Sequence, residues 1–187
     1  MAIRNFLCRD TRGITLIELI LASAILLLVL AVSYPFYSYT TRSIDIATKQ
    51  REVQQNVLLA KELIEKRIRL SSCLTLLKNA PASPGEKNCE GFIKTQELYV
   101  TESGKLMHST EGGNQEELLG SVAEDTNYTL TFEKSGSRPR ILSYTIYGEY
   151  NGQEYEISSE ILILNVAEIQ EEEIGAKAVA IRYAFSD

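Results

Sequence analysis

The chain has 187 residues, a formal net charge of −6, and 24% charged residues. This length fits one domain with an appendage, and the acidic balance argues against nucleic-acid binding, which normally uses a basic face. Residues 1–13 nevertheless hold three arginines against one aspartate. A basic N-terminus ahead of an acidic body is typical of a chain whose start stays on the cytoplasmic side of a membrane while its body is exported.

An apolar run of membrane-spanning length follows this leader. Only three residues between positions 14 and 32 are polar or charged, Glu18 among them. About 20 apolar residues in a helix cross a hydrocarbon core of about 30 Å, so we expect a transmembrane helix over residues 14–41. A carboxylate at the centre of a bilayer costs about 2.5–3.5 kcal/mol. We therefore expect Glu18 to have a partner charge, supplied by another subunit.

Two plainer interpretations of this run are a secretory signal peptide and a simple signal anchor. The signal peptide would be cleaved at the small residues Ala-Val-Ser of positions 31–33. The run is longer than the usual apolar region of a signal peptide, about 7–15 residues, and it contains a charge. These features weaken the first interpretation, but the residues alone exclude neither.

The segment from Arg12 to Ile20, RGITLIELI, resembles the cleavage and methylation motif of type IV prepilins and pseudopilins. The basic leader, the glycine, the Thr-Leu-Ile-Glu run and the apolar stretch all occur in register. In that family a membrane peptidase cuts after the glycine on the cytoplasmic face and methylates the new N-terminus. The resemblance implies cleavage between Gly13 and Ile14, N-methylation of Ile14, and an assembly role for Glu18.

Elementary chemistry agrees with this resemblance. Glycine before the cut leaves the backbone open to a protease, and the cut creates a charged amine four residues from Glu18. In a stack of subunits that amine would neutralise the carboxylate of a neighbour, and breaking such a buried pair costs about 3–5 kcal/mol. Pro35 stands where family members often carry a helix-bending proline, and it removes a backbone donor, so we expect a bend there.

From Arg42 to about Leu77 the helical pattern continues and becomes amphipathic. Its apolar residues recur at spacings of four, three, four and four, which places them on one face of a helix. They are Val53, Val57, Ala60, Ile64 and Ile68. We expect this stripe to pack on a sheet, an interpretation that we prefer to a partner-binding groove. A helix from Ile14 to Lys78 is longer than a membrane is thick, so its C-terminal part belongs to the exported domain.

Loop-forming prolines and a glycine at positions 81–85 are followed by short segments with strand patterns. We expect strands over residues 92–100, 105–108, 128–134 and 176–185. The clearest hairpin signal is Asn151-Gly152, between residues 141–150 and 153–165, because Asn-Gly suits a type I′ turn. A long helix on an antiparallel sheet is an α+β architecture, which is also the pilin-like fold that the resemblance implies. The expected domains are a cleaved leader (1–13), a transmembrane or filament-core helix (14–41), and an amphipathic helix with a β-sheet head (42–187).

The three cysteines have different expected fates. Cys8 lies in the leader and is lost on cleavage. Cys73 and Cys89 remain as an even pair in a domain expected outside the cytoplasm, so we expect a disulfide between them. In the chain-entropy model this bridge stabilises the fold by about 3 kcal/mol. Two free thiols are the alternative, and without nearby histidines the pair is a poor zinc site.

Catalysis has little support in the sequence. The single histidine, His108, stands beside a Gly/Ser/Glu-rich stretch, and we expect it to be exposed and solvated. No nucleophile elbow, phosphate loop or His-Glu-x-x-His motif is present. Glu168 and the glutamates at 171–173 form an acidic cluster, which we interpret as a solvated face and not as a calcium site. We expect no enzyme activity, no cofactor or metal, and no direct nucleic-acid partner.

These features predict a structural subunit of a type IV pilus, or of a secretion or competence pseudopilus, that acts in filament assembly or priming. The resemblance implies other pilin subunits, a prepilin peptidase and methyltransferase, an inner-membrane platform and membrane lipid as partners. We expect a single-pass protein with a cytoplasmic N-terminus and an extracytoplasmic head, and we favour a minor subunit. The alternative function is a membrane-anchored extracellular module that binds a ligand.

Overall fold

The computed structural model describes residues 14–81, 89, 95–110, 114–120, 125–136, 138–172 and 177–185. The leader, with Cys8 and Gly13, lies outside these residues. Of the two residues at the predicted cleavage site, only Ile14 is therefore described. The chain divides into two units. The first ends at Asp45 and the second begins at Ile46, and each is described by itself.

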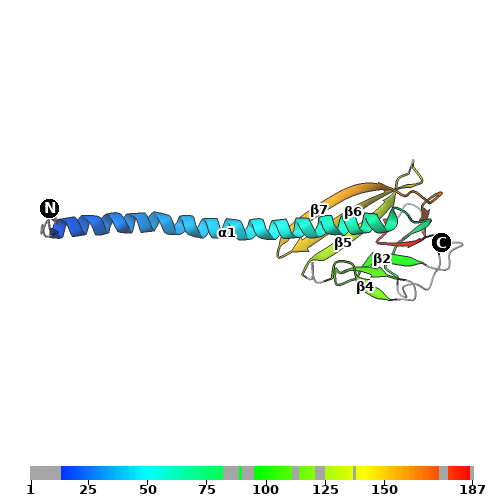
Figure 1. Cartoon of the computed structure of the whole chain (residues 1–187), viewed down its shortest axis with the longest axis horizontal. Helices are drawn as coiled ribbons and strands as arrows, with labels where there is room; N and C mark the ends of the chain where they lie inside the picture. Colours follow the sequence, from blue (N-terminus) through cyan, green and yellow to red (C-terminus); the bar gives the residue numbers. More distant parts are fainter. Residues whose placement is uncertain are drawn as a thin grey trace, which may run out of the picture. The chain divides into compact units, whose positions relative to one another are not determined.

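One helix, α1, begins at Leu16, ends at Ile68 and contributes to both units (Figure 1). In the second unit the five apolar residues of the predicted stripe, from Val53 to Ile68, are fully buried. The helical period of the sequence therefore identified the face of α1 that packs on the head. The side chains of this stripe belong to one apolar core with residues of both sheets described below.

The helix ends earlier than the sequence pattern predicts. Ser71 terminates it, since both its N–H and its hydroxyl donate to the carbonyl of Ile68, at 3.1 and 2.8 Å. We predicted that the leucine-rich segment that follows would continue the helix. It forms strand β1, Cys73–Leu77, instead. The backbone of β1 pairs with β8 on one side and with β9 on the other, and its leucine side chains are buried. A short apolar run cannot be assigned to helix or strand by periodicity alone.

The larger sheet has six strands in the order β4-β3-β2-β9-β1-β8. Their bounds are β1, Cys73–Leu77; β2, Gln96–Val100; β3, Leu106–Ser109; β4, Gln115–Glu117; β8, Gln170–Glu171; and β9, Ala180–Ala184. The pair β1–β8 is parallel and the other neighbours are antiparallel, so the sheet is mixed by one short pair. The predicted strands at 105–108 and 176–185 correspond to β3 and β9, and that at 92–100 to β2 from Gln96 onward, since 92–94 lie outside the described residues. Strands β1, β4 and β8 were not predicted.

The second sheet is the antiparallel meander β5-β6-β7, with β5 at Asn127–Lys134, β6 at Ile141–Tyr150 and β7 at Gln153–Leu162. The turn between β6 and β7 has positive φ at both central residues, 49° at Asn151 and 75° at Gly152. Both values fit the predicted type I′ hairpin, whose twist matches that of the flanking strands. Alternate residues of β6 face the core, so this sheet buries one face against α1 and exposes the other.

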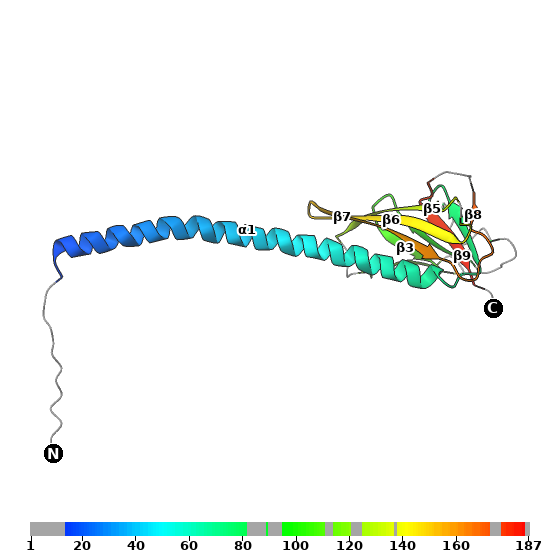
Figure 2. The same ribbon diagram turned by 90° about the horizontal axis from the view of Figure 1, so that it is seen from above.

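The head is an α+β structure, as predicted. In Figure 2 the strands of the second unit lie to one side of the C-terminal turns of α1, and in Figure 1 these turns run between β7 and β2. The sheets are joined where Phe132 and Ala178 exchange two backbone hydrogen bonds, of 2.8 and 3.0 Å. Tyr128 N–H also donates to the carbonyl of Gly104, at 2.7 Å.

The helix approaches the second sheet closely at Gly148 of β6. A Cβ atom at this position would lie 2.4 Å from Cγ2 of Val57, far inside van der Waals contact. Gly148 therefore has a packing role: the absence of its side chain lets the buried stripe of α1 settle directly onto the strand.

Candidate assembly segment

The first turn of α1 begins with a side-chain cap. Thr15 immediately precedes the helix, and the N–H of Glu18 donates to its carbonyl, at 3.1 Å. Thr15 Oγ1 lies 3.4 Å from the same nitrogen. Thr15 and Glu18 thus have the spacing of a capping box, in which Glu or Gln at the third helical position is favoured. The observed contacts use the backbone N–H of Glu18, and our sequence reasoning missed this Thr-x-x-Glu spacing.

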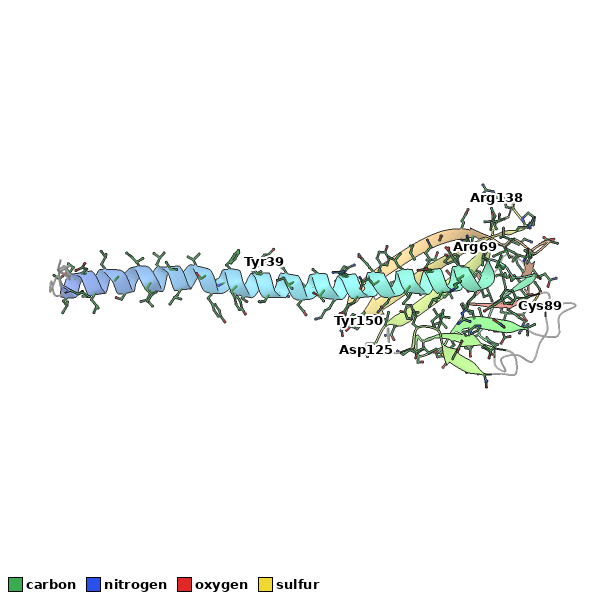
Figure 3. The ribbon with its side chains drawn as sticks, viewed as in Figure 1. Tyr39, Arg69, Cys89, Asp125, Arg138 and Tyr150 are labelled. Atoms are coloured by element: carbon green, nitrogen blue, oxygen red, sulfur yellow. A yellow bond between two sulfur atoms is a disulfide. The ribbon has the colours of Figure 1, made fainter. Side chains whose placement is uncertain are left out.

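The first unit presents an uncovered apolar surface. Every large apolar side chain from Ile14 to Ile44 is 51–77% exposed. Within α1 an 18-residue window has a mean hydropathy of 2.7 and none of it is buried, so by length and composition this helix is able to cross a membrane. Figure 3 shows the side chains of this part, Tyr39 among them, pointing away from the helix. Soluble monomers rarely expose apolar patches above a few hundred Å², so the segment requires lipid or protein around it.

Several serine and threonine hydroxyls in this segment donate to carbonyls of the helix itself. Ser23 donates to the carbonyl of Ile20, at 2.9 Å, and Ser33 to that of Val29, at 2.7 Å. Further along, the Thr40 hydroxyl donates to the carbonyl of Phe36, at 2.9 Å. Such back-bonding gives these three hydroxyls a partner that does not depend on water, which suits an apolar surrounding.

Pro35 lies inside α1, and the helix continues on both sides of it. Proline has no backbone N–H, so the carbonyl of Ala31 loses its usual helical donor at this point. The bend that we expect there stays a prediction.

Cys73 and Cys89 form the disulfide that the sequence predicts. Their Cα atoms are 6.2 Å apart and their positions differ by 16. Both cysteines are buried and pack with Ala184 of β9, so the bridge closes the chain over the end of the larger sheet. The alternative of two free thiols does not describe this structure.

His108 is not the exposed, solvated residue that we expected, because its side chain is buried beneath α1. It follows Leu106 by two residues in β3, so both point to the core face of the sheet, a signal that the sequence contained. Its Nδ1 lies 3.0 Å from Oε1 of Glu116, and the hydroxyl of Tyr183 lies 2.9 Å from Nε2. Arg67 of α1 reaches the same ring, with Nη1 3.1 Å from Nδ1. The burial is tolerated because each ring nitrogen has a polar partner.

Burial lowers the pKa of His108 below its ordinary value, and the Arg67 guanidinium acts in the same direction. The hydrogen bond with Glu116 opposes these effects without overcoming them. The side-chain amide of Gln96 also lies 3.1 Å from Nε2. A neutral ring with Nδ1–H donating to Glu116 and Nε2 accepting from Tyr183 fits these partners when that amide turns its NH₂ group to the ring. Since the side chain is closed to solvent, it offers no accessible general base; its visible role is to connect α1 to β3, β4 and β9.

The smaller sheet is also connected to the helix by polar side chains. The hydroxyl of Tyr144, on the core face of β6, donates to a carboxylate oxygen of Glu65. The same glutamate lies within 3.4 Å of Arg69 and 3.7 Å of Lys61 on its own helix. The N–H of Leu164, just after β7, donates to the carbonyl of Arg69 at 2.9 Å. The last two turns of α1 therefore contact both sheets.

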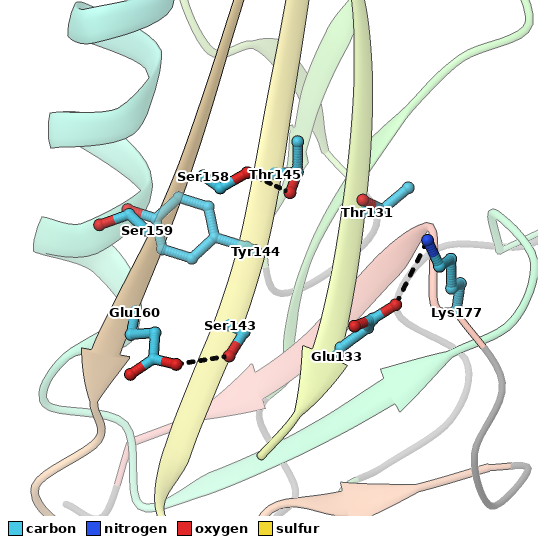
Figure 4. Close-up of a pocket in the computed structure, with 9 residues that line it drawn as sticks. All are labelled: Thr131, Glu133, Ser143, Tyr144, Thr145, Ser158, Ser159, Glu160 and Lys177. Carbon is cyan, nitrogen blue, oxygen red and sulfur yellow. Dashed lines mark hydrogen bonds and ion pairs between the residues drawn. The ribbon is translucent and has the colours of Figure 1, made fainter.

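A shallow hollow of about 410 Å³ lies on the outer face of the smaller sheet (Figure 4). Hydroxyl and charged groups line it, and they already bind one another: Glu133 pairs with Lys177 at 3.5 Å, and the hydroxyls of Thr145 and Ser158 are 2.8 Å apart. For the alternative function, ligand binding, the head thus provides a polar surface whose groups already pair with one another. That function stays a hypothesis.

The acidic residues near the end of the chain are partly engaged elsewhere. Glu168 lies 2.6 Å from the ammonium of Lys134 on β5. Glu173 is outside the described residues. In the part of the chain that the structure describes, no group of three or more His, Cys, Asp or Glu side chains is arranged to hold a metal ion.

Comparison with known proteins supports the resemblance at the N-terminus. The family described as the prokaryotic N-terminal methylation motif matches residues 8–34. No curated protein matches the chain. Among solved structures, a point mutant of the PilB minor pilin from Streptococcus sanguinis is similar over 75% of this chain, with 16% identity and a TM-score of 0.55. The unmutated PilB minor pilin is similar over 78% of the chain, also with 16% identity, with a TM-score of 0.48. The chain spans 35% of the length of each of these structures.

The helix and the two-sheet head define a pilin-like fold. The chain combines this fold with the prokaryotic N-terminal methylation motif at residues 8–34.

Proposed function

We propose that this protein is a minor structural subunit of a type IV pilus or pseudopilus, which enters the filament after a prepilin peptidase removes residues 1–13. The observation that carries the proposal is the methylation motif at the start of a helix whose apolar surface is uncovered. Other pilin subunits, an inner-membrane assembly platform and membrane lipid are the proposed partners. The N-terminus is cytoplasmic before processing, and the head lies outside the cytoplasm.

Assembly depends on the charges at the two ends of the first turn. Cleavage frees the amine of Ile14, the peptidase methylates it, and the Glu18 carboxylate stands four positions, about 6 Å, further along the helix. A neighbouring subunit shifted along the filament axis places its amine beside this carboxylate. Pairing removes two unpartnered charges from an apolar surrounding, and it also fixes the axial offset between subunits.

Two features support a minor subunit over the principal one. Ile14 stands where pilins usually carry phenylalanine, and the head has two sheets, one of them mixed. The solved structure with a similar fold is also that of a minor pilin. The range of systems served by such subunits includes secretion, competence, twitching and adhesion.

The decisive experiment separates the two roles of Glu18. In Glu18→Gln the capping box is kept, because Gln serves at this position as well as Glu, but the charge is lost. In Glu18→Ala both are lost. We expect both variants to be cleaved and inserted normally and both to be excluded from filaments, as measured by immunoblots of sheared filaments against the membrane fraction.

Normal incorporation of Glu18→Gln with exclusion of Glu18→Ala would assign the residue to capping and contradict the charge pairing. Processing is tested independently by mass spectrometry of the mature N-terminus, where we expect N-methylated Ile14. An N-terminus at Met1, or at Tyr34 after signal-peptide cleavage, would contradict the pilin assignment.

A further inference from the structure

A group of four aromatic residues follows the apolar run of α1 directly. Tyr34, Phe36, Tyr37 and Tyr39 occupy four of six consecutive positions and are 69–76% exposed. All four belong to the first unit, where no other described element covers them. Such a concentration of large exposed rings on a bare helix calls for a surrounding that accepts them.

The four side chains point around the whole helix. With about 100° between successive residues, they project at about 0°, 200°, 300° and 140° when Tyr34 is taken as the origin. A helix that docks on one protein partner presents an apolar stripe roughly 100° wide. A ring of aromatic groups instead fits a surrounding that is the same in every direction, which is what a lipid bilayer provides to a single helix.

The ring also stands at the correct distance along the helix. Tyr34 is 20 positions beyond Ile14, which is about 30 Å of helix and equals the thickness of a hydrocarbon core. Beyond the ring come Thr40 and Thr41, and then Arg42, the first charged residue after Glu18. The order apolar run, aromatic ring, hydroxyls, charge follows the polarity profile from the bilayer interior to water.

We propose that Tyr34, Phe36, Tyr37 and Tyr39 form an interfacial ring that binds the lipid headgroup region on the non-cytoplasmic side and sets the depth of α1 before the subunit leaves the membrane. The inference rests on the part of the proposed function that inserts α1 in a membrane. Tyrosine suits this level because its ring packs among acyl chains while its hydroxyl reaches water.

This ring determines where Glu18 lies. Glu18 is 16 positions before Tyr34, about 24 Å along the helix, so it stands about 6 Å inside the opposite boundary of a 30 Å core. The carboxylate is thus near the cytoplasmic headgroups and not at the bilayer centre, where a charge is most costly. The freed amine of Ile14 lies at the boundary itself, within reach of water and of the peptidase.

The depth is measurable by thiol labelling of the full-length chain in bacterial membranes. Single cysteines replace Ser23, Ser33, Ser38 or Ser43 in a Cys8→Ser background, and the two head cysteines are protected by their disulfide. A membrane-impermeant maleimide is added on the non-cytoplasmic side. We expect rapid labelling of Ser43→Cys, slower labelling of Ser38→Cys, and none of Ser33→Cys or Ser23→Cys.

Two matched variants then test the ring. Changing all four aromatics to leucine lengthens the apolar run. The helix should then shift so that the residues just beyond the ring enter the hydrocarbon core by about one turn, 5.4 Å. Labelling of Ser38→Cys then falls about tenfold, the equivalent of about 1.4 kcal/mol. Changing all four to tryptophan keeps the interfacial preference, so the labelling profile stays that of the parent.

An unchanged profile in the leucine variant would overturn the ring while leaving the membrane helix intact. Loss of labelling in the tryptophan variant as well would also overturn it, because it would show a shape-specific contact with a protein neighbour. Labelling of Ser23→Cys as rapid as that of Ser43→Cys would mean that α1 does not enter the membrane, and this result alone would also contradict the proposed function.

Discussion

Substitution of Gly148 by alanine tests the packing of α1 on the smaller sheet. Where space allows, Gly→Ala stabilises a protein by about 0.4–1 kcal/mol, because alanine restricts the unfolded chain. At Gly148 the added Cβ lies 2.4 Å from Cγ2 of Val57, more than 1 Å closer than the optimal carbon–carbon separation of about 3.5–4.0 Å. We therefore expect the opposite sign, a loss of about 1–3 kcal/mol from overpacking.

The measurement is urea unfolding of the detergent-solubilised chain, followed by circular dichroism. Gly148→Ala should lower the midpoint without changing the slope, since the surface exposed on unfolding is the same. Gly136 provides the matched control, because a Cβ there meets nothing within 4 Å and its backbone is not left-handed. Gly136→Ala should be neutral or slightly stabilising.

A double-mutant cycle identifies the clash itself. Val57→Ala removes the methyl group that the new Cβ meets, at a cost of its own of about 1.6 kcal/mol for two buried carbons. Gly148→Ala should then cost at least about 1 kcal/mol less in the Val57→Ala background than in the parent. Additive effects, or a stabilising Gly148→Ala, would refute the reasoning that this glycine exists to admit the helix.

Three further predictions concern buried polar groups and the disulfide. Arg182→Met removes the guanidinium that lies 2.7 Å from the fully buried carboxylate of Glu97, and it should cost about 3–5 kcal/mol of stability. Arg138→Met breaks an exposed pair with Glu160 and should cost at most about 1 kcal/mol. An equal effect of both variants in urea unfolding would contradict this prediction. Replacing Cys73 and Cys89 by serine should lower stability by about 3 kcal/mol, read as a fall in Tm under oxidising conditions, and reduction of the parent chain should reproduce that fall. Because burial holds the pKa of His108 below its ordinary value of about 6.5, the unfolded chain takes up this proton first as the pH falls, so the stability from the neutral ring is present above pH 6.5 and is lost below it. His108→Gln should therefore reduce the slope of stability against pH below 6.5. An unchanged slope would show that the pKa of His108 is the same in the folded and the unfolded chain.

The sequence predicted the elements that a strong local pattern specifies. The stripe from Val53 to Ile68 repeats with the helical period over four turns, and Asn151-Gly152 fixes its hairpin through the backbone it prefers. Strand β1 was mistaken for helix because five residues, four of them apolar, carry no period of their own. Its pairing with β8 and β9 decides the matter, and both lie about 100 residues later in the chain.

For the candidate site, the motif from Arg12 to Ile20 was readable because its residues are adjacent. The neighbours of His108 were not, since Arg67, Glu116 and Tyr183 come from a helix and two other strands that meet only in the fold. The Thr-x-x-Glu spacing at Thr15 and Glu18 was readable in principle. The functional explanation of Glu18, which stays a proposal, drew attention away from this local pattern.

The last two turns of α1 bear on how the head comes apart. Arg67 binds the cluster around His108 in the larger sheet, while Glu65 binds Tyr144 in the smaller one. Both sheets also pack in one apolar core with the buried stripe of α1, so separation of either sheet from the helix disturbs the core of the other. We expect the head to open as a single cooperative unit, so that slowly exchanging amides of β2 and β6 report the same opening free energy in native-state hydrogen exchange. Among the described strands of the head, neither sheet would then be the weaker half at which unfolding under force begins.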